Sequence, residues 1–176
     1  QLDQMAELRP GEAAGEAAGM PAFLDLVNRA LAQSIRSELV VYVHGANNTV
    51  ARASAQAAQL RHFTGRRVVM VSFLWPSTGS ILRYFTDVGH AAASVDPFAR
   101  MIEALAENTK ASSIEVVAFS AGAQIVSPGL VKLATPRPGE TREQLRQRLR
   151  LSQVYFAAPD IDTRRFANEL AQYIDI

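Results

Sequence analysis

The 176-residue sequence predicts an α/β protein with a mainly parallel sheet and helices on both of its faces. Short apolar runs alternate along the chain with segments of helical spacing, which is the order that parallel strands and crossover helices require. Four of the apolar runs end in polar, turn-forming residues. Because the carboxyl ends of parallel strands meet at one edge of the sheet, a functional site is expected at that edge.

The first part of the chain predicts an arm followed by the start of a single domain. Residues 1–20 are rich in alanine, glycine and glutamate and predict a flexible N-terminal arm, and residues 21–176 form the predicted domain. Pro21 suits the first position of a helix, which apolar spacing extends to Ser37. The next elements are a buried strand, an alanine-rich helix and a second buried strand, over residues 39–43, 50–62 and 68–74.

The second part of the chain continues the alternation. Residues 80–92 are expected to form a loop and a short irregular or helical segment that contains Tyr84, Asp87 and His90. Asp96 and Pro97 are then expected to cap and open a helix that ends near Glu107. The remaining elements are a strand, a helix, a charged solvated helix, a strand and a last helix, over residues 114–119, 121–134, 143–150, 152–157 and 166–174.

Ser120 occupies a sharp turn between a buried strand and a helix. The residues two before and two after it, Ala118 and Gly122, are both small, as a close approach of strand and helix requires. Such a turn lifts a serine hydroxyl above the sheet edge and is typical of a nucleophile elbow. The alternative interpretation is an ordinary serine in a tight turn.

Composition excludes several classes of function. The balance of 18 basic and 17 acidic residues gives no electrostatic reason to expect nucleic acid or an anionic membrane as a partner. The chain has no cysteine, and no histidines and carboxylates stand at metal-ligand spacing. No glycine-rich loop of phosphate-binding form follows a strand. The sequence therefore predicts no metal and no cofactor. The apolar runs of the chain are too short to span a membrane. The sequence does not indicate a cell compartment.

Four motifs carry a resemblance to a known superfamily. They are HGANN, FLWPS, AFSAG and AAPDID, at residues 44–48, 73–77, 118–122 and 157–162. With them the chain resembles an α/β-hydrolase, and more narrowly a poorly characterised, mostly bacterial branch of that superfamily. The similarity runs from about Leu39 to Phe166. Phe119 departs from the branch, which more often has a histidine before the serine.

The resemblance implies a serine hydrolase that acts on carboxylic esters of small-molecule or lipid-like type. Ser120 would attack the acyl carbonyl. The backbone N–H of Ala121 and one from the loop of Gly45 and Ala46 would form the oxyanion hole.

Other polar residues have two interpretations each. His44 is expected to brace the oxyanion loop through its ring hydrogen bonds. Asn47 either orders that loop or caps the next helix. Asp160 is either an acid that orients a catalytic histidine or part of an Asx turn and helix cap with Asp162. His90 is the candidate within the chain for a displaced base.

The resemblance also implies something that the sequence lacks. In the superfamily the histidine follows the serine along the chain, and no histidine follows Ser120 here. We therefore expect a domain that is incomplete at its C-terminus, with the histidine supplied from outside the segment. A missing C-terminal segment or a second copy of the chain would cover the open sheet edge. The alternative is a catalytically inactive α/β-hydrolase scaffold that serves in binding or assembly.

Overall fold

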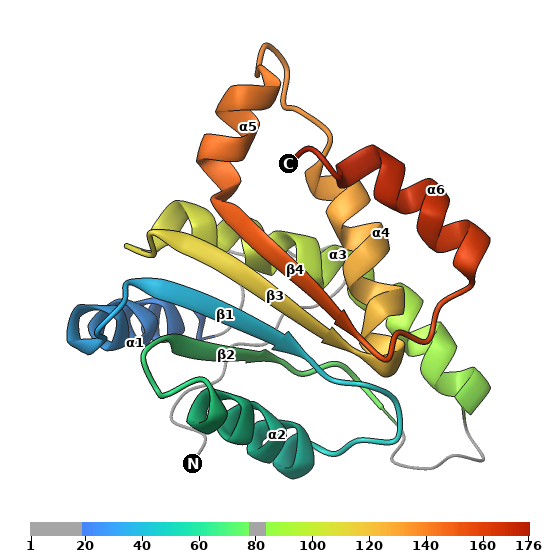
Figure 1. Cartoon of the computed structure of the whole chain (residues 1–176), viewed down its shortest axis with the longest axis horizontal. Helices are drawn as coiled ribbons and strands as arrows, with labels where there is room; N and C mark the ends of the chain where they lie inside the picture. The colour runs from blue at the N-terminus through green and yellow to red at the C-terminus, as the bar shows by residue number, and fades with distance from the viewer. Residues whose placement is uncertain (1–18, 78–83) are drawn as a thin grey trace.

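The computed structural model of the chain describes residues 19–77 and 84–176. Within these ranges four parallel strands form one sheet in the order β2–β1–β3–β4 (Figure 1). The strands β1, β2, β3 and β4 are Glu38–Val43, Val69–Phe73, Ser113–Phe119 and Leu151–Ala157. The predicted α/β class with a mainly parallel sheet is confirmed.

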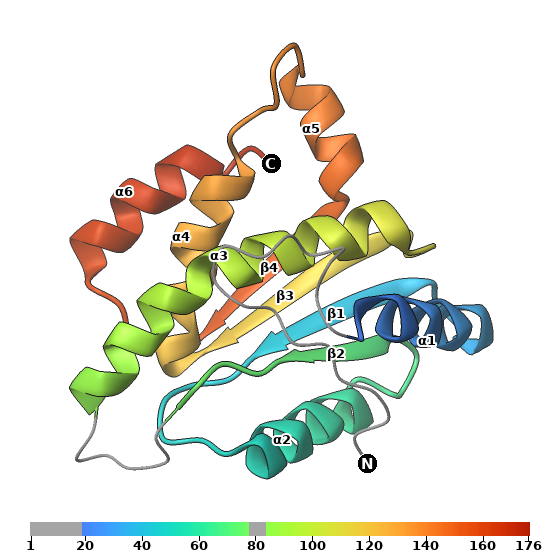
Figure 2. The same cartoon turned by 180° about the vertical axis from the view of Figure 1, so that it is seen from behind.

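Helices cover both faces of this sheet. They are α1 (Met20–Gln33), α2 (Val50–Phe63), α3 (Tyr84–Asn108), α4 (Ala123–Leu133), α5 (Arg142–Leu149) and α6 (Thr163–Tyr173), and a 3-10 turn, η3 (Ser120–Gly122), precedes α4. The crossover through α2 leads from β1 outward to β2, whereas that through α3 leads back across β1 to β3. Right-handed crossovers in opposite directions place their helices on opposite faces. Figure 2 shows α3 in front of the strands.

The main core lies between the sheet and the layer that contains α1, α3 and α4. Apolar side chains of the central strands β1 and β3 meet those of α3 and α4 there, with Leu39, Phe98, Ile114 and Ile125 fully buried. Five consecutive residues of β1 are buried, as expected for a strand that is covered on both faces. The core thus fixes the two central strands whose ends carry HGANN and Ser120.

The structure corrects the prediction for the segment before β3. α3 is one helix of 25 residues, whereas a loop with a short irregular or helical segment over 80–92 and a separate helix from Pro97 were expected. Residues 78–83 lie outside the described ranges. Pro97 lies inside the helix, and Asp96 pairs with Lys132 at 2.7 Å instead of opening the helix. Ala91, Val95 and Phe98 are buried on one stripe across the proline. Their packing holds together a helix that a proline alone would interrupt.

The first helix is shorter than predicted. α1 ends at Gln33, four residues before Ser37, because Ser34 adopts an extended conformation. The backbone N–H of Arg36 then bonds to the carbonyl oxygen of Arg67 at the entrance to β2. Most of the predicted N-terminal arm lies outside the described ranges, but Met20 begins α1 and is buried.

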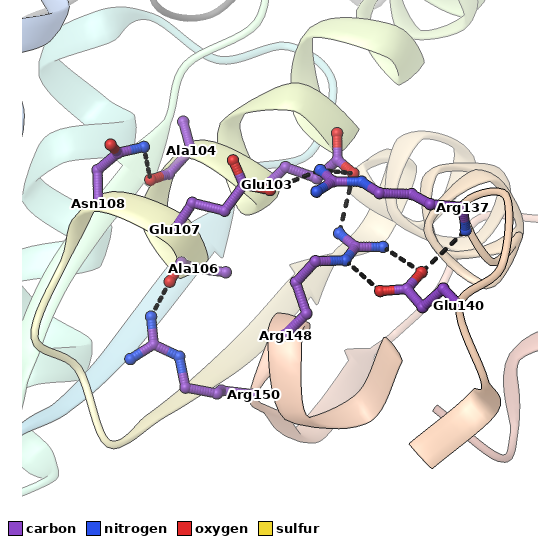
Figure 3. A network of polar contacts seen from close by, with 9 residues as sticks. All are labelled: Glu103, Ala104, Ala106, Glu107, Asn108, Arg137, Glu140, Arg148 and Arg150. Atoms are coloured by element: carbon purple, nitrogen blue, oxygen red, sulfur yellow. Dashed lines mark hydrogen bonds and ion pairs between the residues drawn. The ribbon is translucent and has the colours of Figure 1, made fainter. Parts of the chain in front are cut away.

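The charged segment before β4 is a network rather than a freely solvated helix (Figure 3). Arg148 in α5 is 15% exposed and donates to Glu140 at 2.7 Å and to Glu103 of α3 at 3.1 Å. Arg150 adopts a left-handed conformation at the end of α5, and its guanidinium donates to the carbonyls of Ala106, Thr109 and Ala111. These contacts tie α5 and the start of β4 to the C-terminal end of α3.

Candidate active site

The carboxyl ends of the four strands meet at one rim of the sheet. The strand order places WPS, HGANN, Ser120 and APDID side by side along that rim. Ser120 therefore lies between the loop after β1 and the turn after β4. In an open parallel sheet this rim is where ligands bind.

Ser120 has the strained backbone of a sharp strand-to-helix turn. Its φ is 51°, in the left-handed region, which costs a non-glycine residue on the order of 1 kcal/mol. Packing on the sheet holds it there. A Cβ on Gly122 would lie 2.6 Å from the carbonyl oxygen of Val43 and 2.9 Å from that of His44. The elbow needs a small residue at this position because backbone atoms of β1 fill the space.

Similar strain recurs along the rim. Five non-glycine residues in the described ranges have positive φ, and three of them follow strand ends: Asn47 at 53°, Ser120 at 51° and Ala158 at 45°. Strained backbone of this kind persists where surrounding contacts fix it, and it gathers at functional sites.

The loop after β1 approaches the serine closely. A Cβ on Gly45 would lie 2.9 Å from Cβ of Ser120 and 3.2 Å from the carbonyl oxygen of Phe119, so a glycine is needed there. Asn47 does not cap α2, because that cap is Thr49, whose hydroxyl accepts from the N–H of Arg52 at 3.3 Å. The backbone N–H of Asn47 instead donates to Asp87 at 3.3 Å.

His44 is buried with both ring nitrogens engaged. Nδ1 lies 2.8 Å from the carbonyl oxygen of Gly45, and Nε2 accepts from the backbone N–H of Trp75 at 3.2 Å. Since Nε2 accepts, the proton of the neutral ring is on Nδ1. The indole of Trp75 stacks on the imidazole at 5.2 Å and donates to the His44 carbonyl at 2.7 Å.

Burial lowers the pKa of His44 from 6.5, although hydrogen bonds with Gly45 and Trp75 and the charge of Asp87 act in the opposite direction. The ring is therefore neutral near pH 7. With the Nε2 lone pair already occupied, this imidazole fits a bracing role better than that of a base for Ser120.

The turn after β4 contacts the elbow through the main chain. The backbone N–H of Asp160 donates to the Ser120 carbonyl at 3.0 Å. Asp162 caps α6, with its carboxylate accepting from the N–H of Arg165 at 2.8 Å. The structure thus brings Asp160 beside the nucleophile candidate and gives the capping role to Asp162.

The remaining histidines lie in helices. His62 is exposed near the end of α2, where Nδ1 accepts from the guanidinium of Arg66. His90 lies in α3 and not in a loop, and its Nδ1 is buried without a hydrogen-bond partner among the described residues. Among the described residues, no side chain hydrogen-bonds to the Ser120 hydroxyl. Within the same part of the chain, no group of three or more histidine and acidic side chains could hold a metal ion.

Comparison with known protein families gives a match over nearly the whole chain. A family described as an alpha/beta hydrolase of unknown function (DUF900) matches residues 22–175. The chain belongs to this family. A search of curated proteins found no match. The predicted relation to the α/β-hydrolase superfamily is therefore confirmed.

In this α/β-hydrolase domain, three residues join the loops of the rim through polar contacts that sequence reasoning missed. Asp87 and Ser77 bind each other at 3.1 Å, and each also accepts a backbone N–H from the loop after β1. Trp75 holds His44. The contacts of Trp75 and Ser77 could have been predicted, because the HGANN and WPS motifs follow strands that are adjacent in the sheet. No sequence pattern indicated the contact of Asp87 with Asn47, because the two residues lie forty positions apart.

The described part of this domain has no helix that is both long and apolar enough to cross a membrane.

Proposed function

We propose that this α/β-hydrolase domain provides the nucleophile of a serine hydrolase that cleaves carboxylic esters, with Ser120 as the acylated residue. The observation that carries the proposal is the strained elbow, which holds Ser120 at φ 51° on the rim between the HGANN loop and the Asp160 turn. Strain of this kind costs stability and is maintained here by the contact of Gly122 with β1.

The reaction proceeds in two steps. The Ser120 oxygen bonds to the acyl carbon while its proton passes to a histidine supplied from outside the described residues. The ester C–O bond then breaks, and the alcohol leaves with that proton. In the second step water adds to the acyl carbon and gives a proton to the histidine. The bond to Ser120 then breaks, the serine oxygen takes that proton, and the carboxylic acid is released.

The oxyanion hole would be formed by backbone amides on both sides of Ser120. Ala121 follows the serine at the start of the helix, and Gly45 and Ala46 lie in the loop packed against it. The amide of Asn47 is used by Asp87, which favours the earlier amides of the loop as donors. Each donor in such a hole contributes on the order of 3 kcal/mol to the transition state.

A catalytically inactive scaffold is the second candidate. One observation favours it: within the described residues, His44 has both ring nitrogens engaged, and no side chain hydrogen-bonds to the Ser120 hydroxyl. A nucleophilic serine needs a base within hydrogen-bond reach or one that arrives with the substrate. On this reading the rim binds a partner and Asp160 only shapes the turn.

Intact-mass analysis of the natural-length protein, before and after treatment with a fluorophosphonate, decides between the two. For a hydrolase we expect one adduct, because the activated serine displaces fluoride from phosphorus. Ser120→Ala should abolish the adduct. Ser152→Ala removes an exposed serine of β4 and should leave the adduct unchanged. If the folded wild-type protein takes no adduct, the enzyme proposal is wrong and the scaffold is favoured.

His90→Gln tests the displaced base in the same assay. If the base comes from outside the described residues, this variant should be labelled at a rate within about twofold of wild type, since the change leaves the proton acceptor in place. A loss of about a hundredfold or more would instead assign the base to α3.

A further inference from the structure

Asp87 is a buried carboxylate that joins α3 to the loop after β1. It is 1% exposed, and one of its oxygens, Oδ2, accepts both the backbone N–H of Asn47 at 3.3 Å and the hydroxyl of Ser77 at 3.1 Å. Asn47 belongs to the connection from β1 to β2, whereas Ser77 and Asp87 both belong to the connection from β2 to β3. A carboxyl group at a site this buried is costly unless hydrogen bonds satisfy it, and these two contacts contribute to that.

Ser77 extends the same arrangement by one residue. Its oxygen accepts the backbone N–H of Asn48 at 3.1 Å while its proton is donated to Asp87. Two successive amides of the loop, at Asn47 and Asn48, are therefore anchored by one carboxylate and one hydroxyl. Asn47 is also the loop residue with positive φ. The two anchoring hydrogen bonds help to keep it in this unfavourable conformation.

The anchoring determines which loop amides remain for the substrate. The N–H groups of Asn47 and Asn48 are directed at Asp87 and Ser77, and the loop approaches Ser120 at Gly45 instead. The hydrogen bond from the Asn47 N–H to Asp87 therefore fixes the orientation of the peptide group between Ala46 and Asn47, and with it the loop that precedes it. A shift of about 1 Å in an oxyanion donor can cost a hundredfold in rate, so the orientation of this loop matters to catalysis.

We propose that Asp87 is a positioning residue of the active site, which sets the oxyanion loop through the Asn47 amide and, by way of Ser77, through the Asn48 amide. This inference rests on the proposed hydrolase function, but the bond itself can be tested without activity. In this role Asp87 does not act on the substrate or on the reacting atoms. It acts through the backbone of the loop.

The test uses the natural-length protein and the variants Asp87→Leu and Asp87→Asn. Leucine has the same branched arrangement of heavy atoms, although it is larger, and has no acceptor, whereas asparagine keeps one carbonyl oxygen that can accept the Asn47 N–H. With a p-nitrophenyl ester we expect kcat of Asp87→Leu to fall by about tenfold to a hundredfold, with KM within about twofold. Asp87→Asn should recover much of the loss. Asp96→Ala, an exposed aspartate in the same helix, is the control and should leave kcat unchanged.

Amide hydrogen exchange at Asn47 and Asn48, measured by NMR, gives the second readout. Exchange of both amides should become faster in Asp87→Leu, and that of Asn48 alone should do so in Ser77→Ala, which also serves if the Asp87 variants fail to fold. Unchanged exchange in both variants would overturn the positioning role whatever the activity. Faster exchange with unchanged kcat would show that Asp87 holds the loop but does not serve the reaction, and would also overturn the proposal.

The two proposals fail in different ways. If wild-type protein shows no Ser120-dependent hydrolysis or labelling, the proposed function is wrong and Asp87 has no reaction to serve. If Ser120→Ala abolishes hydrolysis but Asp87→Leu does not lower kcat, the function stands and the positioning role is rejected.

Discussion

Gly122 and Gly89 differ in what surrounds them, although each lies within or next to a helix. A Cβ on Gly122 would contact backbone carbonyl oxygens of Val43 and His44 at 2.6 and 2.9 Å, and such atoms can move only if β1 moves. A Cβ on Gly89, in α3, would meet nothing within 4 Å. The first glycine is required by packing at the elbow, and the second is not.

Gly122→Ala should therefore destabilise the protein by about 1–3 kcal/mol through overpacking, and also slow the labelling of Ser120 because the elbow must shift. Gly89→Ala should stabilise it by about 0.5–1 kcal/mol, since alanine is the better helix former. Urea unfolding gives both free energies of unfolding. Equal effects of the two substitutions would mean that the elbow is not tightly packed on β1.

The charge network at α5 makes the folding stability of the protein depend on pH, through Glu140. Hydrogen bonds from Arg148 and from the backbone N–H of Arg137 lower the pKa of Glu140 from 4.5 to about 2. A carboxyl group whose pKa is lower in the folded state contributes stability above its ordinary pKa, and that contribution is lost as the pH falls from about 4.5 to about 2.

Glu140→Gln should remove this dependence. Between pH 5 and pH 3 we expect its urea unfolding midpoint to fall by less than that of wild type, because glutamine binds no proton in either state. Glu143→Gln, which changes an exposed side chain of α5, should leave the wild-type slope unchanged. The same slope for Glu140→Gln and wild type would contradict a role for this network in acid stability.

At the level of elements, sequence reasoning succeeded where a pattern is local. The four strands are apolar runs bounded by turn residues, and the elbow is a spacing of small residues around Ser120. It failed at α3, since Asp96-Pro97 has the local signature of a helix start while the burial of Ala91 and Phe98 continues the helix across it. Asp87 was consequently assigned to a separate loop and short irregular or helical segment, and its contact with Asn47 could not be predicted.

Taken over the whole molecule, the candidate site is built from strand ends that are distant in sequence. Sheet order brought HGANN, Ser120 and Asp160 to one rim as expected, because parallel topology places all carboxyl ends on the same side. The contacts that stiffen the rim are tertiary, such as Trp75 on His44. No short-range pattern predicts which side chains on neighbouring strand ends meet.

The two edges of the sheet differ in how accessible they are. β2, at one edge, has five residues, and none of them is exposed. β4, at the other, has seven residues without charge or proline; four are exposed, and among the described residues it pairs with β3 alone. An apolar hollow of about 240 Å³ lies beside it, lined by residues of β4, α4 and α6. Accessible, uncharged edges of this kind promote association with other chains.

We therefore expect the 176-residue chain to self-associate through β4, and Gln153→Lys to reduce that association because a lysine on an edge strand disfavours strand pairing. Gln33→Lys, which adds the same charge at an exposed position of α1, is the matched control and should have little effect. Light scattering over a concentration series measures both. Equal reductions would indicate a net-charge effect, and no reduction by Gln153→Lys would exclude β4 as the associating edge. A loss of association confined to Gln153→Lys would show that the chains associate through the β4 edge.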